Sequence, residues 1–211
     1  MAQAACGSLW PDFSCVQLSE RSRCFADLFR VQSLGIGPDM KPGYPLVTFY
    51  INGKEVKAGF EFSAAAKSVG KPDYFLQVAG ATVEWTASGQ PFQKVTSVRI
   101  GDAPPIDLAS TTTCYKVVTN LYVASLLGLI ETVTGGLLSV KPKAADCQTA
   151  VDPATQIVDA DPTTPALEEL KEWQALTLFV GGLPDTDLDM IPNVPSSYGA
   201  AAVPPRIVIT P

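Results

Sequence analysis

Three carboxylates at alternate positions form the segment of this sequence that most resembles a metal-binding loop. The segment is DTDLDMIPNVP, residues 185–195, and its carboxylates are Asp185, Asp187 and Asp189. Calcium loops use this spacing because a hard cation takes several oxygen ligands from one tight turn. Such a loop also has a glycine after the third acid and a glutamate at its closing position. Here Met190 follows the third acid, and the closing position holds no glutamate. Two interpretations therefore remain open, a calcium site or a solvated acidic turn.

Histidine is absent from all 211 residues. It is the commonest base at neutral pH and a leading ligand of transition metals. A Ser-His-Asp or Cys-His mechanism is therefore excluded for this chain, and we do not expect a zinc or dimetal hydrolase centre within it. Carboxylate, lysine or tyrosine chemistry remains open, but no nucleophile and base can be paired from their spacing.

Other short motifs favour structural roles. Gly35–Gly37, with the sequence GIG, and the pair Gly135-Gly136 are too short to cradle a phosphate, so they predict turns. The neighbouring carboxylates Glu168 and Glu169 are expected on the exposed face of a helix, where they would be solvated.

The cysteines are odd in number and include no CxxC pair, so metal-finger spacing is missing; the five are Cys6, Cys15, Cys24, Cys114 and Cys147. Two states of the first three remain open: disulfides, if the protein is exported, or buried free thiols. The first ten residues, MAQAACGSLW, have neither a basic n-region nor an apolar h-region, so they are not interpreted as a signal peptide.

The composition is that of an acidic globular chain. Apolar residues make up 46% of the sequence, and the mean hydropathy is +0.18, enough to build a core. Fifteen basic against 21 acidic residues give a net charge of -6. Because nucleic-acid binding needs a basic face, we expect no nucleic-acid partner.

The most apolar run is VVTNLYVASLLGLIETVTGGLLSV, residues 117–140, with Glu131 as its only charge. A helix that crosses a bilayer needs about 20 consecutive apolar residues, and this run is too interrupted for that. It predicts a strand over 115–119, a buried helix over 121–130 and a second strand over 136–140. The helix belongs either to the core alone or to the core and one wall of a ligand site, where the ring of Tyr122 could stack on a planar ligand.

The remaining patterns predict an α+β fold of mixed sheets with a few packed helices, and a Pro-rich C-terminal extension. The first part, of about 140 residues, is expected to contain a helix near 24–31, a loop over 38–45, a strand over 46–51, a turn at Asn52-Gly53, a helix from about residue 54, two strands over 74–87 broken at Gly80, and a strand that ends before Gly101-Asp102.

The last part, residues 146–211, is predicted to be a Pro/Asp-rich extension that packs on the same domain. It should contain one helix over about 165–180, with Thr164 as its cap and Pro165 in its first turn, ended by Gly181-Gly182. The terminal VPPRIVITP predicts a strand added to the edge of a sheet.

Four stretches, taken in order, resemble the C-terminal domain of the 5'-nucleotidases, also called bifunctional UDP-sugar hydrolases. They are FADLFRVQSLG at 25–35, YPLVTFYINGKEVK at 44–57, FLQVAG at 75–80 and VTSVRIGDAPPIDLASTTTCYKVVTNLYVAS at 95–125. The resemblance implies a substrate-binding domain over residues 1–145 that begins inside the family's domain. It also implies a separate N-terminal metallophosphatase domain that holds the divalent metals and performs hydrolysis, so this chain needs no cofactor.

The resemblance also implies where the ligand contacts lie. In the family, two rings stack on the nucleotide base, and arginine, asparagine and aspartate side chains hold the nucleotide. The matching positions are Trp10 for the arginine, Leu34 for the first ring, Ile36 for the asparagine, Gly70 for a glycine, Tyr122 for the second ring, and Leu126, Leu127 and Gly128 for a Gly-Gly-Asp. Of these, only Gly70 and Tyr122 keep the family's chemistry.

Two functional hypotheses follow. The first is the nucleotide-binding domain of a 5'-nucleotidase-like hydrolase with a degenerate, more apolar pocket for a nucleotide or nucleoside-like ligand. The second is a non-catalytic binding or structural module on the cell surface. By resemblance, the protein would be periplasmic, cell-surface or secreted.

Overall fold

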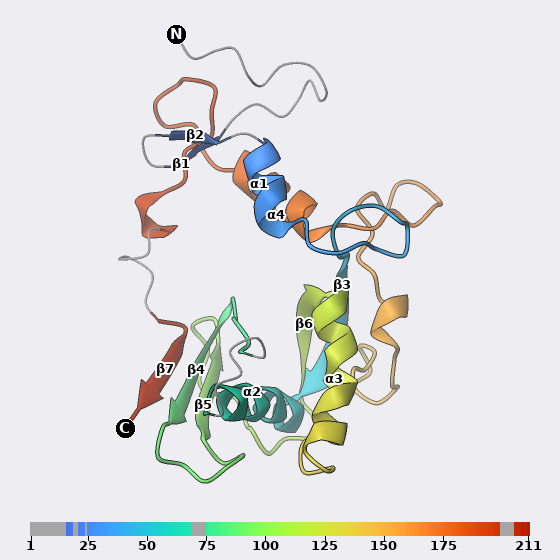
Figure 1. The fold of residues 1–211 in the computed structure, drawn as a ribbon, viewed down its shortest axis with the longest axis vertical. Helices are drawn as coiled ribbons and strands as arrows, with labels where there is room; N and C mark the ends of the chain where they lie inside the picture. The colour runs from blue at the N-terminus through green and yellow to red at the C-terminus, as the bar shows by residue number, and fades with distance from the viewer. Residues whose placement is uncertain (1–15, 19–20, 24, 69–74, 199–204) are drawn as a thin grey trace. The chain divides into compact units, whose positions relative to one another are not determined.

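The computed structural model describes residues 16–18, 21–23, 25–68, 75–198 and 205–211 of the chain (Figure 1). The chain divides into two compact units. We call Met1–Leu46 with Val158–Val203 the helical unit, and Val47–Ile157 with Pro204–Pro211 the sheet unit. Both units take segments from each side of residue 145, so the predicted limit between 1–145 and 146–211 does not coincide with this division and stays a prediction.

The helical unit is built around two packed helices. Its described elements are β1 (Val16–Leu18), β2 (Arg21–Arg23), α1 (Phe25–Gln32), α4 (Glu172–Gly181) and the short 3-10 helix η3 (Ser196–Tyr198). Strands β1 and β2 pair antiparallel. Leu28 of α1 and Val180 of α4 form the buried centre of this unit.

The sheet unit holds the larger core. Its elements are β3 (Leu46–Asn52), α2 (Gly53–Ser68), β4 (Ala81–Thr86), β5 (Val95–Ile100), β6 (Cys114–Asn120), α3 (Leu121–Val133), the 3-10 helix η2 (Pro153–Thr155) and β7 (Ile207–Thr210). One sheet has the order β5-β4-β7 and the other pairs β3 with β6.

The three-stranded sheet is mixed. Strand β4 pairs antiparallel with β5 and parallel with β7, which lies at the edge of the sheet (Figure 1). Val83 and Val98 are opposite each other in the ladder and are fully buried, together with Trp85. Apolar side chains of α2, including Val56, pack on the same cluster, so burial of one sheet face fixes the register.

Two strands of the sheet unit that lead into a helix, β3 and β6, end in an asparagine cap. Asn52 Oδ1 accepts the N–H of Glu55 at 3.0 Å, and Glu55 Oε2 accepts the N–H of Asn52 at 2.9 Å, which is a reciprocal capping box. Asn120 Oδ1 accepts the N–H of Val123 at 2.7 Å at the start of α3. These caps satisfy N–H groups that a helix leaves unpaired. Each helix can therefore begin at the residue directly after its strand ends.

The predicted fold class is confirmed: small mixed sheets and a few packed helices. The predicted helix near 24–31, the strand over 46–51 and the helix that follows it are present. The strand over 115–119, the helix over 121–130 and the terminal edge strand are present as well. Within the described residues, every helix is too short or too polar to span a bilayer.

Two predicted strands are wrong. Residues 75–80 form no strand, because the N–H of Leu76 donates to Ser63 Oγ of α2 at 2.9 Å instead of to a neighbouring strand. Residues 136–140 form a turn and an irregular segment. Here Gly135 and Gly136 take positive φ, and the N–H of Gly136 donates to the carbonyl of Glu131 at 2.8 Å, which closes the end of α3.

The C-terminal helix starts later than predicted, at Glu172 instead of about residue 165. The preceding residues pair with other segments: the N–H of Leu170 donates to the carbonyl of Val158 at 3.0 Å, and the N–H of Leu46 to the carbonyl of Leu170 at 2.8 Å. These pairings use backbone groups that a helix would need, so Thr164 does not cap α4. The predicted end of α4 is confirmed, with Gly182 at the C-cap.

Candidate functional site

The loop over residues 33–45, which we call the ligand loop, carries two of the positions implied by the resemblance. Leu34 is 74% exposed and Ile36 is 59% exposed. The loop folds back on itself: the N–H of Gly43 donates to the carbonyl of Gly35 at 2.8 Å, and that of Tyr44 to the carbonyl of Leu34 at 3.0 Å. The apolar side chains are therefore presented on backbone that is hydrogen-bonded internally.

Both glycines of the GIG motif are required by close contacts in this loop. Gly35 has φ of 80°, and a Cβ there would lie 2.2 Å from the ring of Tyr44. A Cβ on Gly37 would lie 2.1 Å from Nζ of Lys171 and 2.2 Å from a carboxylate oxygen of Glu169. Ile36 of the motif bridges to Pro42, and the turn begins at its last residue, where the N–H of Met40 donates to the carbonyl of Gly37 at 2.9 Å. The motif therefore leads into a turn, and it packs against residues just before α4.

A group of three charges lies under the tip of the ligand loop, with the lysine and the glutamate buried and the aspartate partly exposed. Nζ of Lys171 lies 2.6 Å from Oδ1 of Asp39 and 2.5 Å from Oε2 of Glu169. The N–H of Asp39 donates to Oε1 of Glu169 at 2.7 Å. Lys171 is 1% exposed, and burial of a charge requires such partners. We call Asp39, Glu169 and Lys171 the buried triad.

The electrostatics of the triad favour ionised Asp39. Burial alone would raise its pKa, but hydrogen bonds from Lys171 and from the N–H of Lys41, with the charges of both lysines, hold the pKa below the ordinary value of 3.8. The prediction that Glu169 lies on an exposed helix face is wrong. Glu169 precedes α4 and is buried, because its carboxylate binds both the loop and Lys171.

The first turn of α4 supports the other side of the loop. Nε1 of Trp173 donates to the carbonyl of Pro42 at 3.0 Å. Its ring meets Phe29 of α1 edge-on at 5.4 Å between centroids. A Cβ on Gly43 would lie 2.7 Å from Cδ1 of Trp173. The loop therefore rests on α4 through an aromatic contact as well as through the triad.

Tyr122 and Gly128 lie in the sheet unit, on α3. Tyr122 is 48% exposed, and a Cβ on the exposed Gly128 would meet no atom within 4 Å. Six residues along a helix correspond to a rotation of about 120° short of two full turns, so the two positions face different directions. Leu127 packs in the core of the unit. Leu34 and Ile36 thus lie together on one loop. Tyr122 and Gly128 lie on the same helix but face different directions.

Trp10 and Gly70, the other two positions implied by the resemblance, lie outside the described residues.

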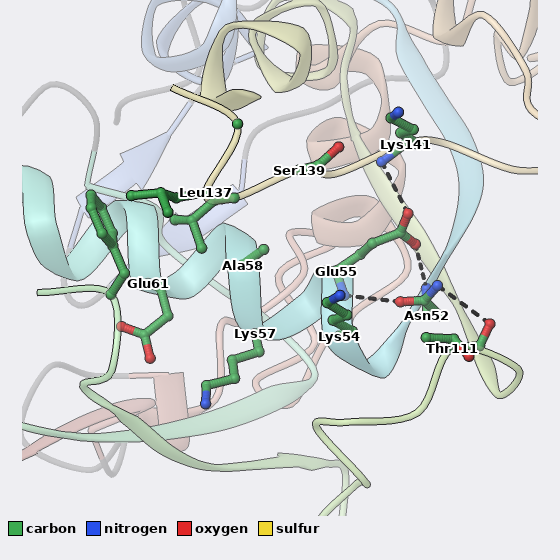
Figure 2. Close-up of a pocket in the computed structure, with 13 residues that line it drawn as sticks. Asn52, Lys54, Glu55, Lys57, Ala58, Glu61, Thr111, Leu137, Ser139 and Lys141 are labelled. Carbon is green, nitrogen blue, oxygen red and sulfur yellow. Dashed lines mark hydrogen bonds between the residues drawn. The ribbon is translucent and has the colours of Figure 1, made fainter. Parts of the chain in front are cut away.

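A pocket of about 460 Å³ opens in the sheet unit between α2 and residues 136–141 (Figure 2). Its carboxylates are used by the fold: Glu55 binds the N–H groups of Asn52 and Lys141, and Glu61 accepts the N–H groups of Lys94 and Val95, both at 2.8 Å. Glu55 also binds Nζ of Lys143.

The lysines at this pocket do not gather around one point. Lys57 and Lys141 extend in opposite directions (Figure 2). With the two carboxylates already bound within the fold, the pocket offers no convergent set of charges for a ligand.

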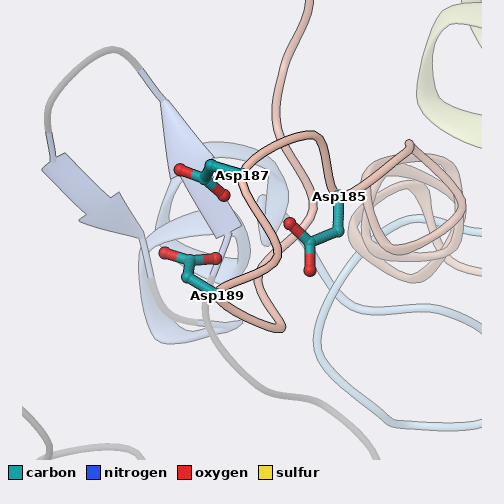
Figure 3. Close-up of side chains that lie close together, drawn as sticks. All are labelled: Asp185, Asp187 and Asp189. Carbon is teal, nitrogen blue, oxygen red and sulfur yellow. The ribbon is translucent and has the colours of Figure 1, made fainter.

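The acidic segment predicted as a calcium site or a solvated turn forms one tight turn (Figure 3). Carboxylate oxygens of Asp185, Asp187 and Asp189 lie within 4.8 Å of one another. Asp185 accepts the N–H groups of Leu188 and Met190, each at 2.8 Å. Burial raises the pKa of Asp185, but these hydrogen bonds outweigh it and lower the pKa. Both interpretations of this segment stay predictions.

A disulfide joins Cys114, at the start of β6, to Cys147, with 5.7 Å between the two Cα atoms and 33 residues of separation. The disulfides expected from the sequence were among Cys6, Cys15 and Cys24, which lie outside the described residues. Spacing gave no signal for the observed pair, because the two cysteines meet only after the chain returns along β3, where Lys143 and Tyr50 exchange backbone hydrogen bonds of 2.8 and 2.9 Å.

The buried triad was also missed, because its members lie up to 132 residues apart. An Asn-Gly-Lys-Glu segment at 52–55 does carry the signal of the capping box, and it could have identified Glu55 as structural.

Comparisons with known proteins agree with this architecture. The sequence model of the 5'-nucleotidase C-terminal domain matches residues 26–133, just over half of the chain. The chain resembles a 5'-nucleotidase precursor from Thermus thermophilus, with 17% identity and a TM-score of 0.50 over 89% of this chain and 28% of the other. It also resembles an NAD nucleotidase from Haemophilus influenzae, with 17% identity and a TM-score of 0.53 over 89% of this chain and 26% of the other.

The chain therefore spans about a quarter of the length of these two structures. No curated protein matches it by sequence. The similarity of fold, the order of the elements and the family match over 26–133 together place it: this chain belongs to the 5'-nucleotidase C-terminal domain family.

Proposed function

We propose that this chain is the ligand-binding C-terminal domain of a 5'-nucleotidase-like hydrolase, and that a separate N-terminal metallophosphatase domain holds the metals and performs hydrolysis. The observation that carries the proposal is the family match over residues 26–133, which includes the ligand loop and all of α3. The absence of histidine from the chain agrees with it, because the catalytic metal centre would then lie elsewhere.

The ligand contacts that we propose are Leu34 and Ile36 on the ligand loop. Both are exposed, and the loop that carries them is anchored by the triad and by Trp173. The exposed ring of Tyr122 on α3 is a separate candidate contact, which rests on the resemblance alone. A contact surface that is already ordered loses less conformational entropy when a ligand binds. This favours a binding role for the loop.

The ligand should be less polar than a nucleotide. At the family's arginine and aspartate positions stand Trp10 and Gly128, which removes two charge-assisted hydrogen bonds worth about 1.5–3 kcal/mol each. Leu34 replaces a stacking ring, which contributes about 1–3 kcal/mol per base in aromatic platforms. The sum is about 4 kcal/mol or more, which weakens nucleotide binding by a factor of about 1,000 or more.

Thermal-shift titration with AMP, UDP-glucose and adenosine tests the degenerate pocket. We expect no change of melting temperature for AMP or UDP-glucose at millimolar concentration, because the charged contacts are missing. A clear rise with either would overturn the proposed loss of nucleotide affinity. The reading frame of the parent gene tests the hydrolase assignment: D-x-H, N-H-D/E and H-x-H motifs upstream would support it, and a parent without them would leave a non-catalytic surface module.

We also propose that the protein works outside the cytosol, in the periplasm, at the cell surface or in the medium. The disulfide between Cys114 and Cys147 supports this, because disulfides persist in oxidising compartments and are rare in the cytosol. Thiol counting on the unfolded, unreduced protein isolated from its native compartment tests it. Free thiols at both cysteines would contradict the proposal.

A further inference from the structure

We infer that Lys171 is a positioning residue: it holds the tip of the ligand loop in the conformation that presents Leu34 and Ile36. The importance of that conformation rests on the proposed function, whereas the role of Lys171 in ordering the loop does not. Lys171 lies just before α4 and 132 residues from Asp39, so it ties the loop to a distant segment of the helical unit.

The contacts converge on the loop tip. Nζ of Lys171 binds Asp39 at 2.6 Å and Glu169 at 2.5 Å, while the second oxygen of Glu169 accepts the N–H of Asp39 at 2.7 Å. Gly37 lies so close that a Cβ would overlap Nζ. The backbone N–H of Lys41 also donates to Oδ1 of Asp39 at 2.9 Å, and the positive charge of Lys41 acts on the same carboxylate.

Charge explains why the lysine is needed. Without Lys171, the carboxylates of Asp39 and Glu169 would face each other in a largely buried place with no cation between them, and like charges repel strongly there. The tip can move away to relieve this, since its anchor at Asp39 is then repelled. The centre of the helical unit, Leu28 with Val180, contains none of these groups, so the loop can open while the helices stay packed.

Hydrogen exchange of Lys171→Met tests the inference without any ligand. We expect the amides of Gly37, Asp39 and Gly43, which donate within the loop or to Glu169, to exchange at least about tenfold faster than in the wild type. The amide of Val83 in the sheet unit should keep its wild-type rate. Lys141→Met is the matched control, because Lys141 makes an exposed ion pair with Glu131 at 3.7 Å, and it should change neither.

A second variant separates positioning from charge balance. Glu169→Gln added to Lys171→Met removes the repulsion and keeps an acceptor for the N–H of Asp39, so it should restore much of the loop protection. Unchanged loop exchange in Lys171→Met, equal acceleration at Val83, or failure of the double variant to restore protection would each overturn the inference.

Steric displacement tests the same contact with all charges kept. Gly37→Ala places a methyl group 2.1 Å from Nζ of Lys171, whereas the methyl group of Gly59→Ala in α2 meets no atom within 4 Å. We expect faster loop exchange only in Gly37→Ala, and equal exchange in the two variants would contradict the role of Lys171 in holding the loop tip. Since the readout is loop order, a chain that binds no ligand but shows this pattern would count against the proposed function alone.

Discussion

Loss of the disulfide between Cys114 and Cys147 should destabilise the sheet unit strongly. The crosslink closes a segment with 33 residues of separation. In the chain-entropy model this restricts the unfolded state by about 12 cal/mol/K, which corresponds to about 3.7 kcal/mol at 25 °C. The variant Cys114→Ala/Cys147→Ala should therefore lower the free energy of unfolding by about 3–4 kcal/mol.

Urea titration of the oxidised protein and of the double variant measures this difference. Dithiothreitol should bring the wild type to the stability of the variant and should leave the variant itself unchanged, which separates the disulfide from the loss of two side chains. A difference below about 1 kcal/mol, or sensitivity of the variant to reduction, would refute the reasoning.

Three further outcomes follow from individual contacts. Asp39 has a pKa below 3.8 in the folded protein, so its contribution to stability is present above that pH and is lost as the pH falls below 3.8. In urea titrations between about pH 5 and 2, the free energy of unfolding should fall less steeply with pH in Asp39→Asn than in the wild type. Equal slopes would contradict this. Asn120→Ala removes the cap of α3 and should cost about 0.5–2 kcal/mol in the same titration; no loss would mean that the cap is not needed. Asp185 already accepts two backbone N–H groups, so we expect millimolar calcium to leave the melting temperature unchanged, and a rise that Asp187→Asn abolishes would favour the calcium site.

Local patterns predicted the parts of the fold that depend on neighbours in sequence. The strand over 46–51 followed by Asn52-Gly53 gave the position of β3 and α2, and Asn120 gave the junction of β6 and α3. In each case an asparagine cap and an apolar run agree. A prediction of this kind succeeds because capping and burial periodicity both act over a few residues.

The features that failed depend on contacts between distant segments. Residues 165–171 have a helical pattern, yet Leu170 pairs with Val158 and Leu46, and tertiary pairing overrides propensity. Glu169 was predicted on a solvated surface because no residue near it in the sequence indicates its partner Asp39, which is 130 residues away. Ligand contacts were placed by resemblance alone, since exposed apolar residues such as Leu34 carry no local signal of binding.

The most direct test of the account restores the family's chemistry at the ligand loop. Leu34→Phe/Ile36→Asn returns a stacking ring and an amide to the positions that we assign to the ligand. We predict that calorimetric titration will show adenosine binding at least about tenfold tighter than in the wild type, within the 1–3 kcal/mol of a stacked ring. Met40→Phe, which adds a ring elsewhere on the same loop, should give no such gain. Unchanged adenosine affinity in Leu34→Phe/Ile36→Asn, with the loop still protected from hydrogen exchange, would contradict the assignment of this loop as the ligand site.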